Sequence, residues 1–270
     1  MIRGERQIEK NVDLRIKKSR NSLFGLLGPA FQYKNLLSPA VKIHLIRTYS
    51  CPILRSGLST FVIRKTQLEP MNIFQRKCLK GFLHLSQTAP TAAIHFLFGE
   101  LPIEAKIHCD MFSLFYSIWT NPNSKIFSIV KYLLETSSEN SRSWSIHLRH
   151  ISKMYKMDDP LECLLKNPPS KATYKEYILT KIVAFHEREL RTEAIDKDKM
   201  KYLNVSLTGL RGKLHPAISG ISTTHAVTKM RPHIKMLTNN YLTFEEKSLQ
   251  SGGSPYCRLC SDVSLSLIHI

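Results

Sequence analysis

The pair of cysteines Cys257 and Cys260, with two residues between them, is the sequence feature with the clearest capacity for chemistry. A turn with this spacing lets two thiolates reach one metal ion, as in the first half of a zinc knuckle. His269 follows and offers a third ligand. Structural zinc sites usually have four protein ligands, so we expect these three residues to bind zinc in a complete protein rather than tightly in this chain alone. A redox dithiol is less favoured, because no βαβ pattern surrounds the pair.

Positively charged side chains form the second candidate site. The 270 residues include 39 Lys and Arg against 21 Asp and Glu, a net charge of +18 that favours binding to a polyanion. Nucleic acid is the most common such partner, with an anionic membrane or a merely basic surface as alternatives. The candidates lie on two predicted helices and just before the second: Arg15, Lys17, Lys18, Arg20, Arg64, Lys65, Arg76, Lys77 and Lys80. Two such faces in one bundle could line a phosphate backbone, whereas an ordinary solvated polar face is the simpler interpretation.

Signatures of enzymes are missing from the sequence. It contains no GxGxxG, P-loop, HExxH or GxSxG motif. Asp158 and Asp159 are adjacent carboxylates, but they precede Pro160 in what we expect to be a solvated turn. His108 and Cys109 are neighbours on a predicted helix and therefore point to different sides. No catalytic residue is predicted.

The elements that position these residues are helices. Apolar side chains recur at helical spacing over the ranges 8–27, 39–49, 67–83, 92–98, 103–119, 174–191 and 224–237. We expect Gly25 and Gly28-Pro29 to end the first helix, Ser38 to cap the second, and Pro52 to stop or kink it. The sequence therefore predicts a mainly α protein: a helical bundle over residues 1–120, a less regular helical region over 121–250, and a short tail over 251–270.

Cysteine usage and hydropathy bear on the compartment. The six cysteines are dispersed, unlike a disulfide framework, and four of them stand singly in apolar or helical contexts typical of a buried thiol. Neither a secretory signal nor a run of apolar residues long enough to span a bilayer is visible. We expect an intracellular protein, nuclear or cytoplasmic, with no membrane partner.

The order of several segments is familiar. It comprises Ile16–Gly28, Leu37–Leu45, Tyr49–Gly57, Leu68–Lys80, Leu83–Pro90 and Leu97–Ala105. This succession resembles the region downstream of the polymerase core in LINE-type, non-LTR retrotransposon reverse transcriptases, and the likeness is best over residues 15–119. The resemblance implies that the bundle is thumb-like. It also implies that Cys257, Cys260 and His269 are the remnant of a cysteine/histidine zinc knuckle, which would need one further cysteine.

Departures from that family decide what the resemblance implies for function. The family's catalytic aspartates lie in a Tyr-x-Asp-Asp hairpin that this chain lacks, and Asp158-Asp159 lies on the wrong side of the thumb-like region without the tyrosine. The resemblance thus implies a non-catalytic fragment that keeps the thumb's contacts to the phosphates of RNA or an RNA–DNA duplex. The alternative is a helical protein-interaction scaffold whose surface is incidentally basic.

Overall fold

The computed structural model describes residues 2–32, 37–195, 200 and 202–238, and these residues form helices and no strand. The mainly α class is therefore confirmed for this part of the chain. The α-helices are α1 (Ile2–Gln32), α2 (Pro39–Leu45), α3 (Cys51–Arg55), α4 (Lys65–Leu83), α5 (Thr91–Phe98), α6 (Ile103–Trp119), α7 (Lys125–Thr136), α8 (Trp144–Met154), α9 (Pro160–Leu164), α10 (Lys171–Ile195), α11 (Pro216–Ser219) and α12 (Thr224–Leu237). Short turns of other helix types are η1 (Ile46–Ser50), η2 (Leu58–Thr60) and η4 (Val205–Leu207).

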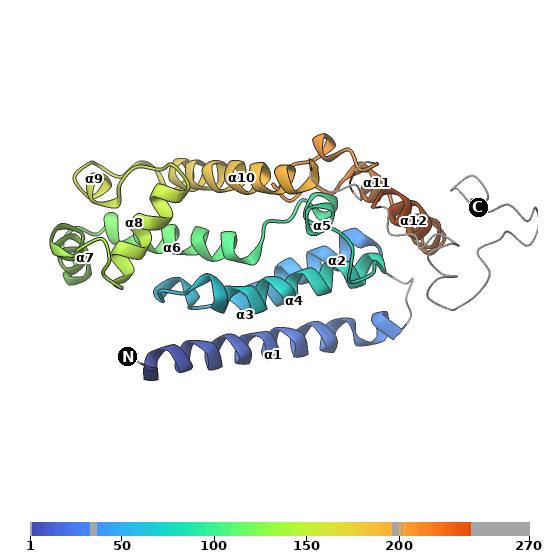
Figure 1. The fold of residues 1–270 in the computed structure, drawn as a ribbon, viewed down its shortest axis with the longest axis horizontal. Coiled ribbons are helices and arrows are strands. Elements are labelled where there is room, and N and C mark those ends of the chain that lie inside the picture. Colours follow the sequence, from blue (N-terminus) through green and yellow to red (C-terminus); the bar gives the residue numbers. More distant parts are fainter. Residues whose placement is uncertain (1, 33–36, 196–199, 201, 239–270) are drawn as a thin grey trace, which may run out of the picture.

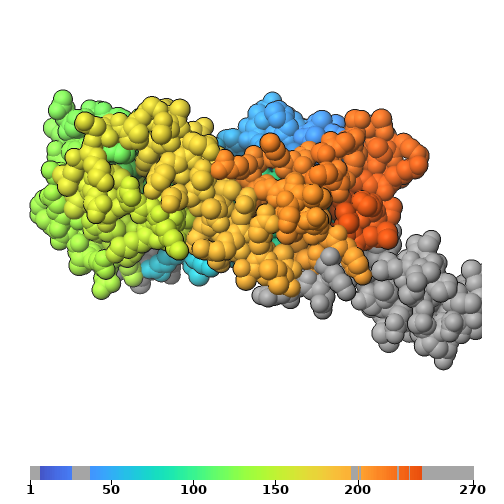
Figure 2. Space-filling model, turned by 90° about the horizontal axis from the view of Figure 1, so that it is seen from above, coloured from blue at the N-terminus to red at the C-terminus, as the bar shows by residue number. Residues whose placement is uncertain are grey.

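The long helices lie side by side in an elongated bundle. Figure 1 shows α1 along one edge and α10 along the opposite edge, with α4 and α6 between them. Helices α7, α8 and α9 gather at one end, and α11 and α12 lie at the other, which Figure 2 shows from the α10 side. The two outer helices, α1 and α10, therefore present different surfaces to solvent.

Helix α5 lies at the centre of the core. Every residue from Ala92 to Phe98 is buried, including His95, as expected of a helix that is apolar on all sides. The cluster of buried apolar side chains around it runs from Leu23 on α1 to Ile234 on α12. This core is continuous across residue 120. The described residues beyond 120 are also mostly helical.

Several helix starts are set by local capping. Ser38 accepts a hydrogen bond from the backbone N–H of Val41 and is followed by Pro39 in the first helical position, as predicted. Ser124 and Ser143 cap α7 and α8 in the same way. Asp159 caps α9, because its carboxylate accepts the N–H of Leu161. Each of these side chains accepts a hydrogen bond from a first-turn N–H group that has no partner within its helix.

Two helices differ from the sequence expectation. Helix α1 continues through Gly28-Pro29 to Gln32 instead of ending there. Before Pro52 the chain widens into the π-helical turn η1, in which the N–H of Cys51 bonds to the carbonyl oxygen of Ile46. Proline has no N–H to continue the regular ladder, and the wider turn lets the chain pass it without stopping. The predicted kink is thus a change of helix type.

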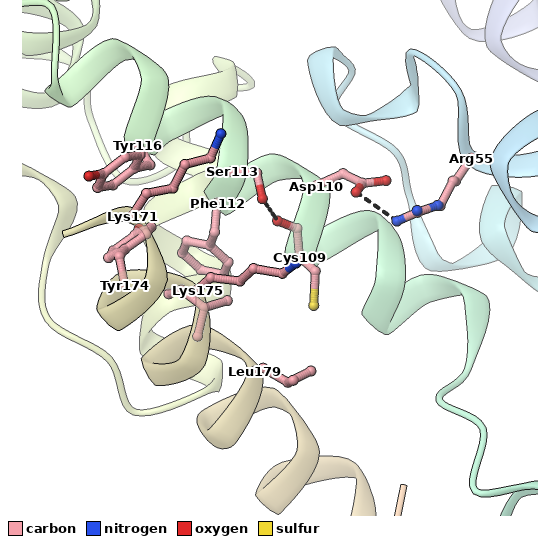
Figure 3. Close-up of a pocket in the computed structure, with 11 residues that line it drawn as sticks. Arg55, Cys109, Asp110, Phe112, Ser113, Tyr116, Lys171, Tyr174, Lys175 and Leu179 are labelled. Atoms are coloured by element: carbon pink, nitrogen blue, oxygen red, sulfur yellow. Dashed lines mark hydrogen bonds and ion pairs between the residues drawn. The ribbon is translucent and has the colours of Figure 1, made fainter. Parts of the chain in front are cut away.

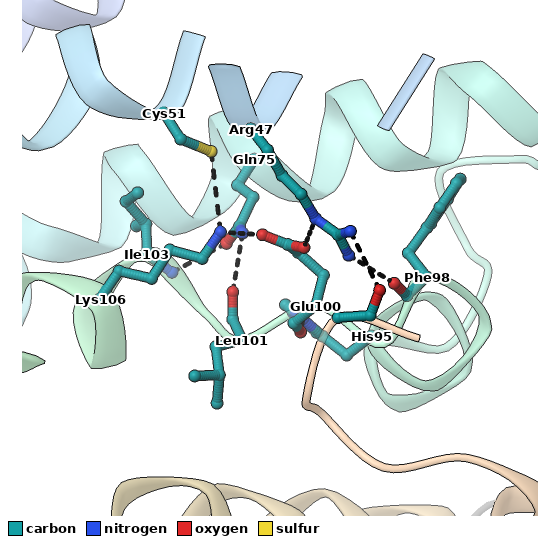
Figure 4. A network of polar contacts seen from close by, with 10 residues as sticks. Arg47, Cys51, Gln75, His95, Phe98, Glu100, Leu101, Ile103 and Lys106 are labelled. Carbon is teal, nitrogen blue, oxygen red and sulfur yellow. Dashed lines mark hydrogen bonds and ion pairs between the residues drawn. The ribbon is translucent and has the colours of Figure 1, made fainter. Parts of the chain in front are cut away.

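A buried ion cluster joins segments that are distant in sequence (Figure 4). The Glu100 carboxylate, 3 % exposed, accepts a 2.7 Å bond from Nε of Arg47 and pairs with the ammonium group of Lys106. Two further Arg47 nitrogens donate to the carbonyl oxygens of Phe98 and Gly212, both at 3.0 Å. One guanidinium therefore ties η1, the end of α5 and the segment after η4 to the same carboxylate.

The segment 208–215 crosses the C-terminal end of α5. The N–H groups of Gly212 and His215 bond to the carbonyl oxygens of Gly99 and Leu97, at 2.8 and 2.9 Å. Gly99 has a φ of +59°, and a Cβ there would overlap the carbonyl oxygen of Lys213. Glycine is therefore required for this crossing, both for its backbone conformation and for the space.

Candidate nucleic-acid interface

The basic residues of α1 follow one another in its second half. Residues 14–32 contain Arg15, Lys17, Lys18 and Arg20 and no acidic residue. Lys17, Lys18 and Arg20 are exposed. At 100° per residue, Lys17 lies one turn from Arg20, whereas Lys18 lies on the opposite side of the helix from Arg20. No acidic residue lies among them in the sequence, so their charges add, and exposed Asp13, four residues before Lys17, offsets part of that charge.

Arg15 differs from its neighbours because its guanidinium is used internally. It is half-buried, donates to the Asn11 side chain at 3.0 Å, and reaches the carbonyl oxygen of Ile53 on α3 at 3.4 Å. Partial burial lowers its pKa from the ordinary value for arginine. Arg15 thus holds α1 against α3 and adds less to the exposed charge than the sequence pattern predicted.

Arg20 brings the cations of α1 next to those of α4. Its guanidinium lies 6.0 Å from the ring centroid of Phe74 on α4. Lys77 is three residues after Phe74, so it is a neighbour of that ring on the helix surface, and it is exposed. Lys17 lies three residues before Arg20 and is therefore its neighbour on the surface of α1. We call Lys17, Arg20 and Lys77 the α1–α4 basic surface, and Lys18 flanks it on the other side of α1.

The other predicted basic residues of α4 do not join this surface. Arg76 pairs with Glu69, with 2.6 Å between its Nη2 and Oε1. Lys80 is 7 % exposed and donates to the backbone carbonyl oxygen of Gln87 at 2.6 Å. Arg76 and Lys80 are four residues apart and share a face, whereas Lys77 is turned about 100° from Arg76. The expectation that Lys80 faces away from the core is wrong.

Arg64 and Lys65 lie at the start of α4. Both are exposed, and the backbone N–H of Arg64 bonds to the Gln67 side chain at 3.0 Å. The charge of Lys65 acts on Glu104: burial raises the pKa of that carboxyl, and Lys65 opposes the rise. Lys65 lies twelve residues before Lys77, which is about 18 Å along a helix. Arg64 and Lys65 are therefore remote from the α1–α4 basic surface.

The candidate zinc ligands Cys257, Cys260 and His269 lie outside the described residues. Within the described part of the chain, no group of three or more His, Cys, Asp or Glu side chains could hold a metal ion. Cys51, Cys78, Cys109 and Cys163 are free thiols. The zinc prediction therefore stays a prediction.

The side chains considered for catalysis have structural partners. Burial raises the pKa of the Cys109 thiol to about 11, which keeps it in the unreactive protonated form at neutral pH. His108 is buried and its Nδ1 lies 2.7 Å from the Tyr155 hydroxyl rather than near the thiol. Asp159 caps α9 and pairs with Arg149, with 2.8 Å between Oδ2 and Nε. None of these groups forms an acid–base or nucleophile pair.

Comparison with known proteins gives no relative. No family model, curated protein or solved structure matches this chain. Among the described helices, none combines the length and apolar character needed to cross a membrane.

A cavity between α6 and α10 was missed by sequence reasoning. Its edge carries Arg55, Lys171 and Lys175, and none of these was among the predicted basic residues. The spacing of Lys171 and Lys175, four residues apart on a predicted helix flank, is the signal that could have drawn attention to them. Their position opposite α6 depends on packing that the spacing alone does not reveal.

Proposed function

We propose that the chain binds the phosphate backbone of RNA or an RNA–DNA duplex through the α1–α4 basic surface. On this proposal it is a non-catalytic, thumb-like piece similar to the C-terminal region of LINE-type reverse transcriptases. The observation that carries it is the packing of Arg20 on α1 against Phe74 on α4, one turn from exposed Lys77, with Lys17 and Lys18 exposed on the same stretch of α1. In the described part of the chain, no acidic side chain forms an ion pair with any of these four cations.

Such a surface favours backbone binding over recognition of bases. A duplex carries closely spaced phosphates with condensed counterions, and each phosphate that a lysine or arginine neutralises releases counterions. Contacts of this kind hold a duplex in place without reading its sequence. The segment order that resembles the reverse transcriptases supports a duplex as the ligand, and the missing Tyr-x-Asp-Asp hairpin supports binding without polymerisation.

A salt series tests the proposal. Binding of a fluorescently labelled RNA–DNA duplex is measured by anisotropy at several potassium chloride concentrations. Four phosphate contacts give a slope of log K against log salt of about −3.6. The triple variant Lys17→Ala, Lys18→Ala, Lys77→Ala should make that slope less negative by about 2.7.

A matched control removes three charges elsewhere. The triple variant Lys125→Ala, Lys131→Ala, Lys166→Ala changes lysines on or near α7 and α9 and should leave the slope unchanged. Arg76→Ala should also have little effect, because that guanidinium already pairs with Glu69. Equal losses in the two triple variants, or binding that does not depend on salt, would contradict the proposal.

A protein-interaction scaffold is the second candidate, and one observation favours it. Ile126, Ile129 and Tyr132 on α7 are each more than half exposed, and their spacing places them on neighbouring positions of one helix. The variant Ile126→Ser, Ile129→Ser separates the two functions. Duplex binding should persist in this variant if the basic surface is responsible, and it should be absent from the wild type if the chain is only a scaffold.

A further inference from the structure

The cavity between α6 and α10 has the features of a small-molecule site. It has a volume of about 330 Å³, and Figure 3 shows side chains from both helices lining it, with Arg55 of α3 at one end. This volume lies at the lower end of the range for ligand pockets, which is about 300–1,000 Å³. The space therefore suits a compact organic molecule.

One end of the cavity is aromatic and held in place. The rings of Tyr116 and Tyr174 stack with centroids 5.0 Å apart, and Trp119 packs edge-on against Tyr174 at 5.8 Å. The Tyr116 hydroxyl donates to the carbonyl oxygen of Pro169 at 2.8 Å, and Nε1 of Trp119 donates to that of Lys166 at 2.9 Å. These bonds fix Tyr116 and Trp119, and Tyr174 packs against both rings, so this wall is preformed for a flat apolar group.

Positively charged side chains also line the cavity, and Figure 3 shows Lys171 beside Tyr116 and Tyr174. Asp110 is neutralised by Arg55, with 2.7 Å between Oδ1 and Nη1. Lys171 and Lys175 are exposed and one turn apart on α10, and Figure 3 shows both side chains extending from α10 towards α6. In the part of the chain that the structure describes, neither lysine has an acidic partner. Two uncompensated positive charges therefore lie beside the aromatic wall.

From this juxtaposition we propose that the cavity binds a small organic phosphate with a planar ring, of the class of a nucleoside monophosphate. The ring lies against Tyr116 and Tyr174, and the dianionic phosphate lies between Lys171 and Lys175. Lysine binds phosphate as a compact point charge, and two lysines match the two negative charges of a phosphate monoester. The Ser113 hydroxyl, which donates to the carbonyl oxygen of Cys109, adds a polar group to the lining.

Calorimetric titration of the full chain tests this proposal with adenosine 5′-monophosphate, adenosine and inorganic phosphate at constant ionic strength. The monophosphate should bind about tenfold more tightly than either part, because each part makes only the ring contacts or only the phosphate contacts. The double variant Lys171→Ala, Lys175→Ala should weaken monophosphate binding by about tenfold or more. Both lysines are exposed, and circular dichroism checks that the variant keeps its helices.

The control separates this site from the α1–α4 basic surface. Lys17→Ala, Lys18→Ala removes the same charge and should leave monophosphate binding unchanged, although it weakens duplex binding under the proposed function. Inorganic phosphate binding as tightly as the monophosphate, equal losses in both double variants, or no monophosphate binding at millimolar concentration would overturn the proposal. Duplex binding by the α1–α4 surface would stand or fall independently, because the two sites share no residue.

Discussion

Removal of the Glu100 carboxylate should be among the most destabilising single changes in this protein. Glu100→Ala leaves Arg47 and Lys106 close together at the α5–α6 junction without their common counterion. Breaking a buried ion pair in this way typically costs about 3–5 kcal/mol, because the remaining charge is poorly solvated. The side chains of Arg47 and Lys106 are 32 % and 18 % exposed, so water relieves part of the cost. We expect about 3 kcal/mol, the lower end of that range.

Urea denaturation followed by circular dichroism measures this loss. The control is Glu139→Ala, whose pair with Lys153 is exposed on both sides and should not change the unfolding midpoint measurably. The double variant Glu100→Ala, Lys106→Met should recover part of the stability, since it removes one of the stranded charges. A Glu100→Ala protein within about 1 kcal/mol of the wild type would refute the argument that this carboxylate neutralises buried cations.

Three further predictions concern stability. Burial lowers the pKa of His95 and His108 to about 3, well below the value of about 6.5 expected in the unfolded chain. The unfolded state therefore binds more protons below pH 6.5, and denaturation at pH 7.5 and pH 5 should show a loss of about 2 kcal/mol for each histidine, whereas equal stabilities would contradict it. Tyr155→Phe removes the hydroxyl between two imidazole groups and should cost about 1–3 kcal/mol in the same assay, whereas an unchanged midpoint would show that this hydroxyl is dispensable. Gly99→Ala should lower the melting temperature strongly, because the added Cβ would overlap the backbone of Lys213. Gly25→Ala, in a helix with open space around it, should raise the melting temperature by the equivalent of about 0.5–1 kcal/mol. The reverse order of the two melting temperatures would refute the requirement for glycine at the chain crossing.

Elements with a clear local signal were predictable from the sequence. Helix α6 has the predicted bounds, Ile103 to Trp119, because its apolar side chains recur at helical spacing over the whole length. Ser38-Pro39 predicted the start of α2 for an equally local reason. The continuation of α1 past Pro29 was not predictable, since glycine and proline weaken a helix without fixing where packing ends it.

Long-range contacts limited what could be predicted of the candidate site. Periodicity placed Lys80 on a polar face, but the carbonyl oxygen of Gln87 and the surrounding core bury it. Arg47 carried no signal in the sequence, because its partners Glu100 and Gly212 are 53 and 165 residues away. Exposed Lys17 and Lys18 were placed correctly because only their own helix determines that position.

The crossing of α5 by the segment 208–215 limits how far the core can fold while the chain is still being synthesised. The carbonyl groups at the end of this innermost helix receive their hydrogen bonds from residues made more than a hundred positions later. Until Gly212 and His215 have been synthesised, the carbonyl groups of Gly99 and Leu97 lack the partners that they have in the folded chain, and non-local closures of this kind are slow. Assembly of the interior is therefore a late event, completed near the end of translation of the described region.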